Sequence, residues 1–527
     1  MVTDGESDRK RIRDIPNRSQ LSPKVADLGP FLAFNQADLN SFTLCAPCNL
    51  APARLIVKSS RSMTATKTEI SLAGQRDVRH HLHPYTQLRD HERDGPLVIV
   101  RGQGVQVFDE HGKGYIEGMA GLWCASLGFS EKRLAEAAYR QMTTLPYYHS
   151  FSGKVPGPVT ELVEAMIKWA PVPMSRVLFA NSGSESNDTA FKLVRYYNNA
   201  KGRPLKKKII ARNKGYHGVT AAAASMSGLA TMHQHFDLPL PGIVRVSCPH
   251  LYQFGLPGET EAQFVDRLAK ELEDTILREG PETVAAFIAE PVQGAGGVIV
   301  PPPGYFAKVQ AILKKYDILF LVDEVITGFG RLGQAFGTQV FDLKPDMITV
   351  AKMLTSAYVP MSALYLTDEI YQTIADASAA VGVFGHGYTY SGHPLACAVA
   401  LETLRIYESD NVIGNVQQVG PRLQQGLQKF KGHPLVGDVR GLGLIGAIEF
   451  AADPSQRKPF DPKRGVGNYF VSRAQAHGLI VRVLMGDVIA FSPPLIITEA
   501  EIDELLARTS LALADTLAWV QSWRAQA

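Results

Sequence analysis

The chain has 527 residues, of which 45% are hydrophobic and 20% are charged. These are ordinary values for a water-soluble folded protein, and the length suits a large two-domain enzyme subunit. The formal net charge of +3 is small for this length, so there is no electrostatic reason to expect nucleic acid or a membrane surface as a partner.

Cysteine content and hydropathy exclude further classes of protein. The five cysteines are scattered, so a disulfide framework is not expected and a reducing compartment is favoured. Cys45 and Cys48 form a C-x-x-C pair, but a zinc site would need a second such pair or nearby histidines, so we expect no metal site. The longest apolar stretch, residues 478–497, is interrupted by Arg482, Asp487 and two prolines, which argues against a membrane span.

The first 75 residues are polar and lack sustained periodicity, so we expect a disordered N-terminal extension there. Met63 begins a segment that would suit an ordinary enzyme N-terminus, and residues 1–62 would then be dispensable. Four acidic residues argue against a transit peptide and favour a cytoplasmic location: Asp4, Glu6, Asp8 and Asp14.

From about residue 85 the pattern is that of a folded domain. Residues 98–109 predict two short strands joined by a turn, and residues 261–278 and 305–315 predict helices. Apolar runs typical of buried strands cover residues 177–180, 208–211, 284–289, 318–322, 347–351 and 362–366. Continuous apolar strands between helices predict an α/β fold with a mostly parallel sheet that helices cover on both faces.

In such sheets the ligand site lies at the carboxyl ends of the strands. The first run is followed by residues 181–188, a turn of small residues that opens a helix. Its backbone N–H groups and the hydroxyls of Ser182 and Ser184 suit a phosphate, although serines are also ordinary helix caps. The second run leads to Tyr216 and His217 between glycines, which is either an aromatic face for a flat ligand or a structural turn.

Three ionisable residues follow the next strands. Glu290 precedes a glycine-rich loop, and Asp323 ends a fully apolar run, where an uncompensated carboxylate would be costly. We therefore expect Asp323 to meet a cation. Lys352 follows the fifth run, and although such a lysine often reaches solvent, a partly desolvated amine has a lowered pKa and attacks carbonyls.

Together, five strand ends offer a phosphate cradle, an aromatic ring, two carboxylates and an amine. Pyridoxal 5′-phosphate (PLP) needs this set, and the joint pattern is more specific than any member. A competing motif, Gly441–Gly446, matches the dinucleotide pattern G-x-G-x-x-G. It leads directly into residues 444–450, which read as a strand, so a dinucleotide site is disfavoured.

These residues, in this order, resemble the class-III PLP-dependent aminotransferases, and within them the ω-transaminases that use pyruvate as amino acceptor. The resemblance covers about residues 80–520 and is carried by residues 181–187, 215–218, 321–331, 351–356 and 387–394. It implies PLP fold type I, with a large PLP-binding domain over residues 131–394. It also implies a smaller α+β domain built from both chain ends, residues 76–130 and 395–527.

The resemblance implies a role for each matching cofactor residue. Lys352 would form the Schiff base with PLP and shuttle the proton, and Asp323 would pair with the pyridinium nitrogen. The other implied contacts are Val325 and Tyr216 on the two ring faces, Ser182, Gly183 and Ser184 at the phosphate, Glu290 near the ring, and Thr389 from the other subunit. Thr389 implies a homodimer, or a tetramer, with shared active sites.

The resemblance also implies substrate-side residues: Trp123, Tyr148, Ala295, Tyr388 and Arg482. Arg482 resembles a mobile arginine that pairs with a carboxylate such as that of pyruvate, and a plain surface arginine is the alternative. Met353 is a departure, because many relatives carry a small residue after the lysine.

The implied reaction is a ping-pong transfer of an amino group from a primary amine or ω-amino acid to pyruvate. It gives alanine and an aldehyde or ketone. A PLP-dependent decarboxylase or aminomutase on the same scaffold is the alternative. A non-enzymatic binding protein and a nicotinamide dehydrogenase are more distant ones, and the sequence does not identify the amine donor.

Overall fold

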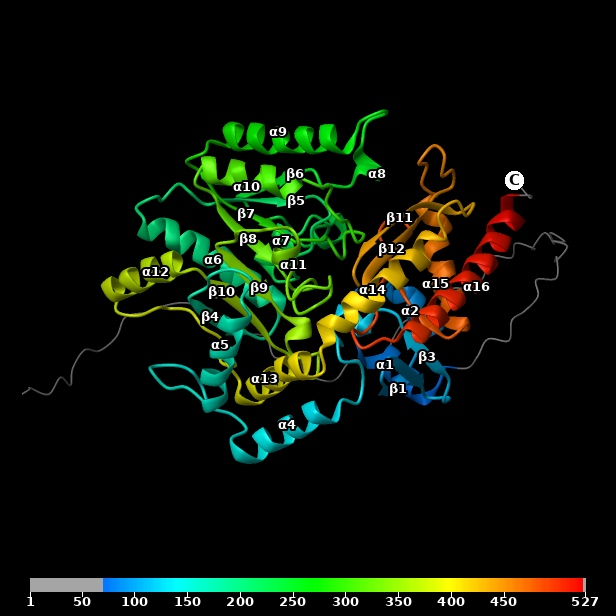
Figure 1. Ribbon diagram of the computed structural model, residues 1–527, viewed down its shortest axis with the longest axis horizontal. Coiled ribbons are helices and arrows are strands. Elements are labelled where there is room, and N and C mark those ends of the chain that lie inside the picture. The colour runs from blue at the N-terminus through cyan, green and yellow to red at the C-terminus, as the bar shows by residue number, and fades with distance from the viewer. Residues whose placement is uncertain (1–69, 525–527) are drawn as a thin grey trace, which may run out of the picture. The chain divides into compact units, whose positions relative to one another are not determined.

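The computed structural model describes residues 70–524 (Figure 1). The dispensable segment expected over residues 1–62, the start at Met63 and the Cys45–Cys48 pair lie outside the described residues. Residues 72–75, the last of the expected extension, lie in helix α1 (Leu72–His80), which α2 (Leu88–Asp94) follows. Within residues 70–524, every helix is too short or too polar to span a lipid bilayer.

A seven-stranded sheet with the order β4-β10-β9-β8-β7-β5-β6 carries the candidate site. Its strands are β4 (Arg176–Ala180), β5 (Lys208–Arg212), β6 (Ile243–Val246), β7 (Val284–Ala289), β8 (Leu319–Asp323), β9 (Met347–Val350) and β10 (Ser362–Leu366). β10 runs antiparallel to both of its neighbours, and the other adjacent pairs are parallel. The predicted α/β class with a mostly parallel sheet is confirmed. All six predicted strands are present.

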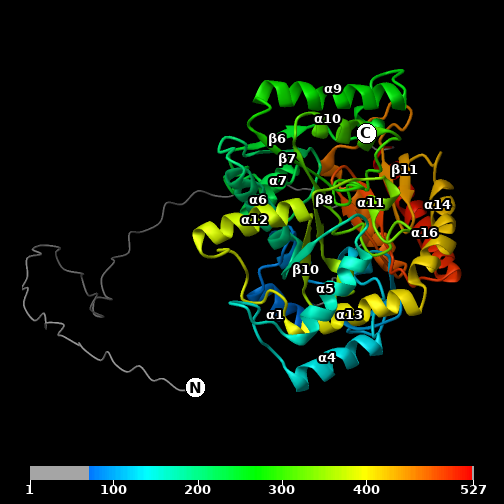
Figure 2. The same ribbon diagram turned by 60° about the vertical axis from the view of Figure 1, so that its left-hand side comes forward.

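Helices cover both faces of this sheet, which explains why its strands are continuous apolar runs. One face packs against α6 (Gly183–Ala200), α7 (Ala221–Met226) and α12 (Asp368–Val381). The other face packs against α9 (Glu261–Glu279) and α10 (Tyr305–Lys315), the two helices predicted there. Figures 1 and 2 show α9 and α10 side by side along that face.

Two four-stranded sheets complete the fold. The first contains β1 (Ile99–Gln103), β2 (Gln106–Asp109), β3 (Gly114–Glu117) and β13 (Leu479–Ile480). The second contains β11 (Val436–Leu442), β12 (Ile445–Phe450), β14 (Arg482–Leu484) and β15 (Val488–Phe491). β11 and β12 form an antiparallel hairpin that turns at Gly443, so the Gly441–Gly446 motif leads into a strand, as predicted. The parallel pairing of β3 with β13 joins the early and late parts of the chain.

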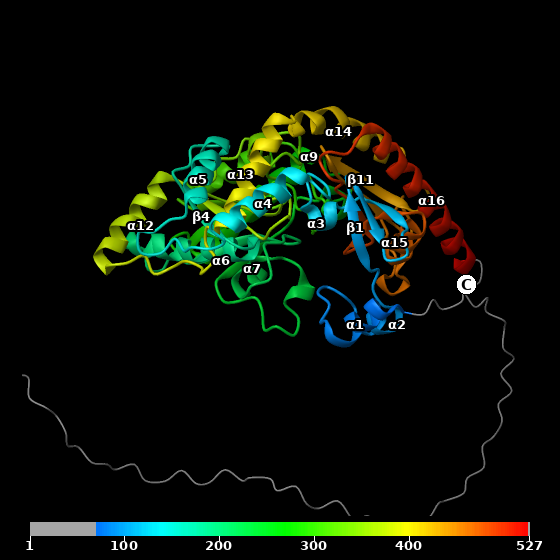
Figure 3. The same cartoon turned by 90° about the horizontal axis from the view of Figure 1, so that it is seen from below.

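The remaining helices are α3 (Ala120–Trp123), α4 (Lys132–Thr144), α5 (Gly157–Trp169), α8 (Leu251–Phe254), α11 (Gly337–Val340), α13 (Pro394–Ser409), α14 (Val412–Gln428), α15 (Val466–Ala476) and α16 (Glu499–Arg524). Short 3-10 turns occur at η1 (Ala230–Met232), η2 (Lys352–Leu354) and η3 (Pro462–Arg464). α15 and α16 pack together beside the sheet that contains β1 (Figure 3). The domain boundaries after residues 130 and 394 stay predictions, because the chain from Ile70 onward forms one compact unit.

Candidate active site

The carboxyl ends of β4, β5, β7, β8 and β9 meet at one edge of the central sheet, around a cavity of about 330 Å³. Antiparallel β10 lies between β4 and β9, so these five strands share one direction. Eight predicted cofactor residues line this cavity: Ser182, Gly183, Ser184, Tyr216, Glu290, Asp323, Val325 and Lys352. The fold therefore brings together side chains that lie up to 170 positions apart in the sequence.

Lys352 starts the 3-10 turn η2 just after β9. Its φ of +46° is in the left-handed region, which non-glycine residues adopt mainly where the surrounding structure holds them there. Burial lowers the pKa of the amine, and the charges of Asp323 and Glu290 oppose that shift. The charge of Arg482 lowers the same pKa further, so the amine is neutral more often than that of a surface lysine.

Asp323 is buried at the end of β8, and protein donors hold both of its carboxylate oxygens. Asn187 Nδ2 donates to Oδ2 over 2.8 Å, and the N–H of Val325 donates to Oδ1 over 3.1 Å. His217 Nδ1 lies 2.9 Å from Oδ2, and both side chains of this pair are buried. The carboxylate is thus fixed in orientation within the cavity lining.

Asn187 and His217 are site residues that the sequence analysis did not assign. Both lie in stretches it singled out, but nothing in their spacing predicts that they meet Asp323. Asn187 comes from α6, and its Oδ1 accepts the Thr349 hydroxyl over 2.8 Å. His217 comes from the loop after β5, so only the assembled sheet places these groups around one carboxylate.

The turn that opens α6 has the features of an anion cradle. Ser182 is the N-cap residue, and Ser184 Oγ accepts the N–H of Val219 over 3.0 Å. A Cβ at Gly218, where φ is +128°, would lie 2.5 Å from Ser184 Oγ, so only glycine lets these loops approach so closely. The N-terminus of an 18-residue helix adds exposed N–H groups and a favourable dipole for a phosphate.

Glu290 fixes the backbone of the aromatic residue in the cavity. The N–H of Tyr216 donates to Oε1 and the N–H of Gly294 donates to Oε2, each over 2.9 Å. Burial is the main cause that raises the pKa of Glu290. Burial also raises the pKa of the Tyr216 phenol, and Tyr85 adds to that shift.

Three predicted substrate-side residues do not line this cavity. Trp123 is buried in a core cluster whose members Val292 and Ile326 line the cavity, and the next residue, Cys124, also reaches it. Tyr148 is 42% exposed and stacks on His149 with ring centroids 4.7 Å apart. Ala295 is half-buried in the glycine-rich loop after β7.

Thr389 and Tyr388, in the loop between α12 and α13, also lie outside the cavity lining. Thr389 is exposed, and its carbonyl accepts the Tyr147 hydroxyl over 2.7 Å. Tyr388 donates its hydroxyl to the carbonyl of Glu185, in the first turn of α6, over 3.0 Å. The loop is thus anchored to the helix whose N-terminus forms the cradle.

Arg482 begins β14 and is half-buried. It does not line the cavity, but its charge lowers the pKa of both Lys352 and Tyr216, which do. Within residues 70–524, no acidic side chain forms an ion pair with its guanidinium. The cation is therefore available to an anionic ligand.

Comparisons with known proteins agree with this geometry. A family model described as Aminotransferase class-III matches residues 88–513. A gamma aminobutyrate transaminase 3, chloroplastic, of Solanum lycopersicum is 49% identical over 89% of this chain and 91% of its own length. A gamma-aminobutyrate transaminase 1, mitochondrial, of Oryza sativa subsp. indica is 53% identical over 80% of this chain and 82% of its own.

Solved structures of transaminases are also similar to this chain in sequence and fold. An omega transaminase from Pseudomonas jessenii in complex with PMP is 53% identical, with a TM-score of 0.84, over 86% of this chain and 99% of that chain. A structure described as a transaminase with L-ala is 50% identical, with a TM-score of 0.79, over 80% of this chain and 100% of that chain. With the family model spanning residues 88–513, the chain belongs to the class-III aminotransferases, whose cofactor is pyridoxal 5′-phosphate.

Proposed function

We propose that this aminotransferase moves an amino group from a primary amine or ω-amino acid to pyruvate, releasing alanine and an aldehyde or ketone. The observation that carries the proposal is Arg482, a cation that pairs with no acidic side chain within residues 70–524 and whose charge lowers the pKa of Lys352. It suits the carboxylate of pyruvate or of an ω-amino acid. The names of the relatives support this choice, because they include gamma aminobutyrate, omega transaminase and L-ala.

The cavity lining fits PLP group by group. Ser182, Gly183 and Ser184 would hold the phosphate at the N-terminus of α6, where Gly218 leaves room for it. Asp323, already oriented by protein donors, would accept a hydrogen bond from the protonated ring nitrogen. When bound, the cofactor supplies an aldehyde that bonds to amines and a ring that withdraws electrons from the neighbouring carbon.

Lys352 is the residue that we propose to move the proton. Because burial lowers its pKa, its neutral amine would accept the proton from the substrate carbon that bears the amino group and deliver it to the carbon on the cofactor side of that nitrogen. Asp323, with Asn187 and His217 behind it, would keep the ring nitrogen protonated during that transfer. Val325 and Tyr216 would contact the two faces of the ring, and Glu290 would hold Tyr216 in place through its backbone.

We also propose that the site is completed in a homodimer. Thr389 would reach the phosphate of the partner subunit, which agrees with its exposure and its place outside the cavity lining of its own chain. Trp123, Tyr148, Ala295 and Tyr388 would line the amine pocket in that assembly.

A donor and acceptor panel tests the proposed reaction. Purified enzyme with PLP is given simple amines, ω-amino acids including γ-aminobutyrate, and either pyruvate or 2-oxoglutarate. We expect one alanine per carbonyl product with pyruvate, and little glutamate with 2-oxoglutarate. Carbon dioxide release without alanine would identify a decarboxylase, and an isomerised amino acid would identify an aminomutase.

The compartment is a separate proposal. We propose a cytoplasmic location, because acidic residues such as Asp4 and Glu6 near the start are unfavourable in a transit peptide. Relatives cited above carry the words mitochondrial or chloroplastic in their names, so the question needs a direct test. Residues 1–69 fused to a fluorescent protein should stay diffuse in plant cells, and accumulation in an organelle contradicts the proposal.

A further inference from the structure

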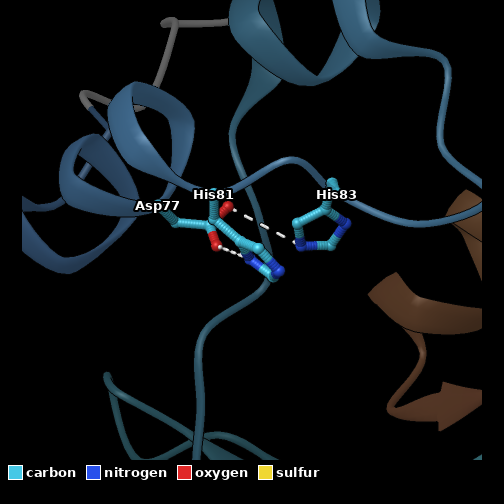
Figure 4. Close-up of side chains that lie close together, drawn as sticks. All are labelled: Asp77, His81 and His83. Carbon is cyan, nitrogen blue, oxygen red and sulfur yellow. Dashed lines mark hydrogen bonds and ion pairs between the residues drawn. The ribbon is translucent and has the colours of Figure 1, made fainter. Parts of the chain in front are cut away.

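A cluster of three imidazoles and one carboxylate lies where α1 ends and the chain turns toward α2. His81 Nδ1 lies 2.7 Å from Asp77 Oδ1, and His83 Nε2 lies 3.6 Å from Asp77 Oδ2 (Figure 4). A fourth side chain, His91 of α2, places Nε2 2.8 Å from Asp77 Oδ2. None of these residues lines the cavity of the active site, and the aminotransferase reaction gives them no role.

The local backbone explains why the side chains converge. Asp77 lies in the last turn of α1 and His81 is the C-cap residue, whose backbone N–H donates to the carbonyl of Asp77, so the two side chains lie close together. His83 follows just beyond the helix and stacks on His91 with ring centroids 4.3 Å apart. One ligand atom from each of Asp77, His81 and His83 lies within 4.8 Å of the other two.

This donor set has the chemistry of a transition-metal site. Zinc takes imidazole nitrogen and carboxylate oxygen at about 2.0–2.2 Å, usually in tetrahedral geometry. Calcium and magnesium prefer oxygen ligands throughout, so two imidazoles disfavour them. The side chains of Asp77, His83 and His81 are 22%, 32% and 57% exposed, so the cluster lies at the surface and is open to an ion from solvent.

A second cluster with suitable donors does not support the same inference. His250, Asp438 and Glu449 also lie within ligand distance of one another. Arg440 Nη1, however, lies 2.7 Å from a carboxylate oxygen of both Asp438 and Glu449, so a guanidinium already supplies the positive charge. By contrast, the ion-pair partners of Asp77 within residues 70–524 are all histidines.

We propose that Asp77, His81 and His83 bind one divalent transition-metal ion, with Zn²⁺ as the representative ion. His91 would orient the Asp77 carboxylate by donating a hydrogen bond to it, as groups behind metal ligands commonly do. The ion would tie the end of α1 to the segment that leads into α2 and stabilise both. No metal site was predicted from the sequence, where only Cys45 and Cys48 have a spacing typical of one.

Zinc binding by the full-length, PLP-loaded enzyme tests the proposal. The protein is stripped with a chelator, dialysed and titrated with Zn²⁺ by calorimetry, with Co²⁺ absorption reporting the coordination number. The test variant is His81→Gln/His83→Gln, and the matched control is His80→Gln, because His80 is exposed and outside the cluster. We expect one tight site in the wild type and the control, and binding at least about 100-fold weaker in the double variant.

A melting experiment supplies a second readout. Zn²⁺ should raise the Tm of the wild type and of the His80→Gln control but not that of the double variant, because an ion that binds only the folded state stabilises it. If the double variant melts lower without metal, Asp77→Asn keeps the side-chain shape and should also lose the tight site. Equal zinc binding by wild type and both test variants, or no tight site in the wild type, overturns the proposal.

Discussion

Lys352 combines a left-handed backbone conformation with a partly buried side chain, and this burial lowers the pKa of its amine. Lys352→Ala should reduce alanine formation from pyruvate by about 10³-fold or more, because a positioned acid–base group alone contributes about 10²–10⁴-fold. The rate is measured by coupling alanine production to a dehydrogenase. Lys344→Ala is the control, because that lysine is exposed, and a Lys352 variant with normal turnover contradicts the assigned role.

The contribution of Arg482 to KM should depend on whether the amino acceptor carries a negative charge. Arg482→Gln removes a charge-assisted hydrogen bond worth about 1.5–3 kcal/mol, so KM for pyruvate should rise about 10–100-fold. KM for an uncharged aldehyde acceptor should change little. Arg422→Gln is the control, since Arg422 forms a surface ion pair with Asp503. Equal increases in KM for charged and uncharged acceptors would mean that Arg482 only supports the fold.

Strands that are buried on both faces of the sheet were the easiest elements to predict from the sequence. The apolar runs at residues 284–289 and 318–322 correspond closely to β7 and β8, because every residue of these strands is buried. Strand β6 was missed because Arg245 interrupts its apolar run. That guanidinium donates to the Met226 carbonyl over 2.6 Å, a contact that a local pattern does not reveal.

Among the site residues, those that directly follow a strand could be predicted from the sequence, and those elsewhere could not. Residues that directly follow an apolar run, such as Asp323 and Lys352, were found because position alone marks them. Asn187 lies inside α6 and contacts Asp323 across 136 positions of sequence, so its role depends on tertiary structure. Trp123 is buried in a core cluster beside the cavity, which shares Val292 and Ile326 with the cavity lining, and its predicted contact with the substrate stays a prediction.

Glu117, the last residue of β3, should make the free energy of unfolding depend on pH. Burial raises the pKa of Glu117 from 4.5 to about 8, while the N–H groups of Gly121 and Met119 act in the opposite direction. The folded state thus favours the neutral carboxyl. This favourable contribution is fully present below about pH 4.5 and is lost as pH rises to about 8.

Glu117→Gln should remove that titration while keeping an oxygen that accepts the N–H of Gly121. We expect the variant to be more stable than the wild type at pH 8 by about 2–4 kcal/mol, with a gap that shrinks toward pH 5. Thermal melting at both pH values measures it. A Tm difference that is the same at pH 5 and pH 8 would show that the carboxyl does not titrate in this range.

At the scale of the whole molecule, exposed aromatic residues gather on the two segments that flank the predicted subunit contact. Tyr147 and Phe151 lie on one segment, Tyr390 lies on the other, and they are 38%, 44% and 56% exposed. The rings of Tyr147 and Tyr390 meet edge to face, with centroids 5.8 Å apart. Exposed aromatic groups of this kind are enriched in protein interfaces, which supports the proposed homodimer.

Mixed dimers test whether Thr389 serves the partner's site. Lys352→Ala and Thr389→Asp subunits should each be nearly inactive alone, because one lacks the amine and the other repels the phosphate. In a mixed dimer, the site that keeps Lys352 receives an intact Thr389 from the partner, so activity should recover. Random exchange makes about half of the dimers mixed with one intact site each, giving about a quarter of wild-type activity. No recovery, with exchange verified by differently tagged subunits, would place Thr389 in the site of its own chain.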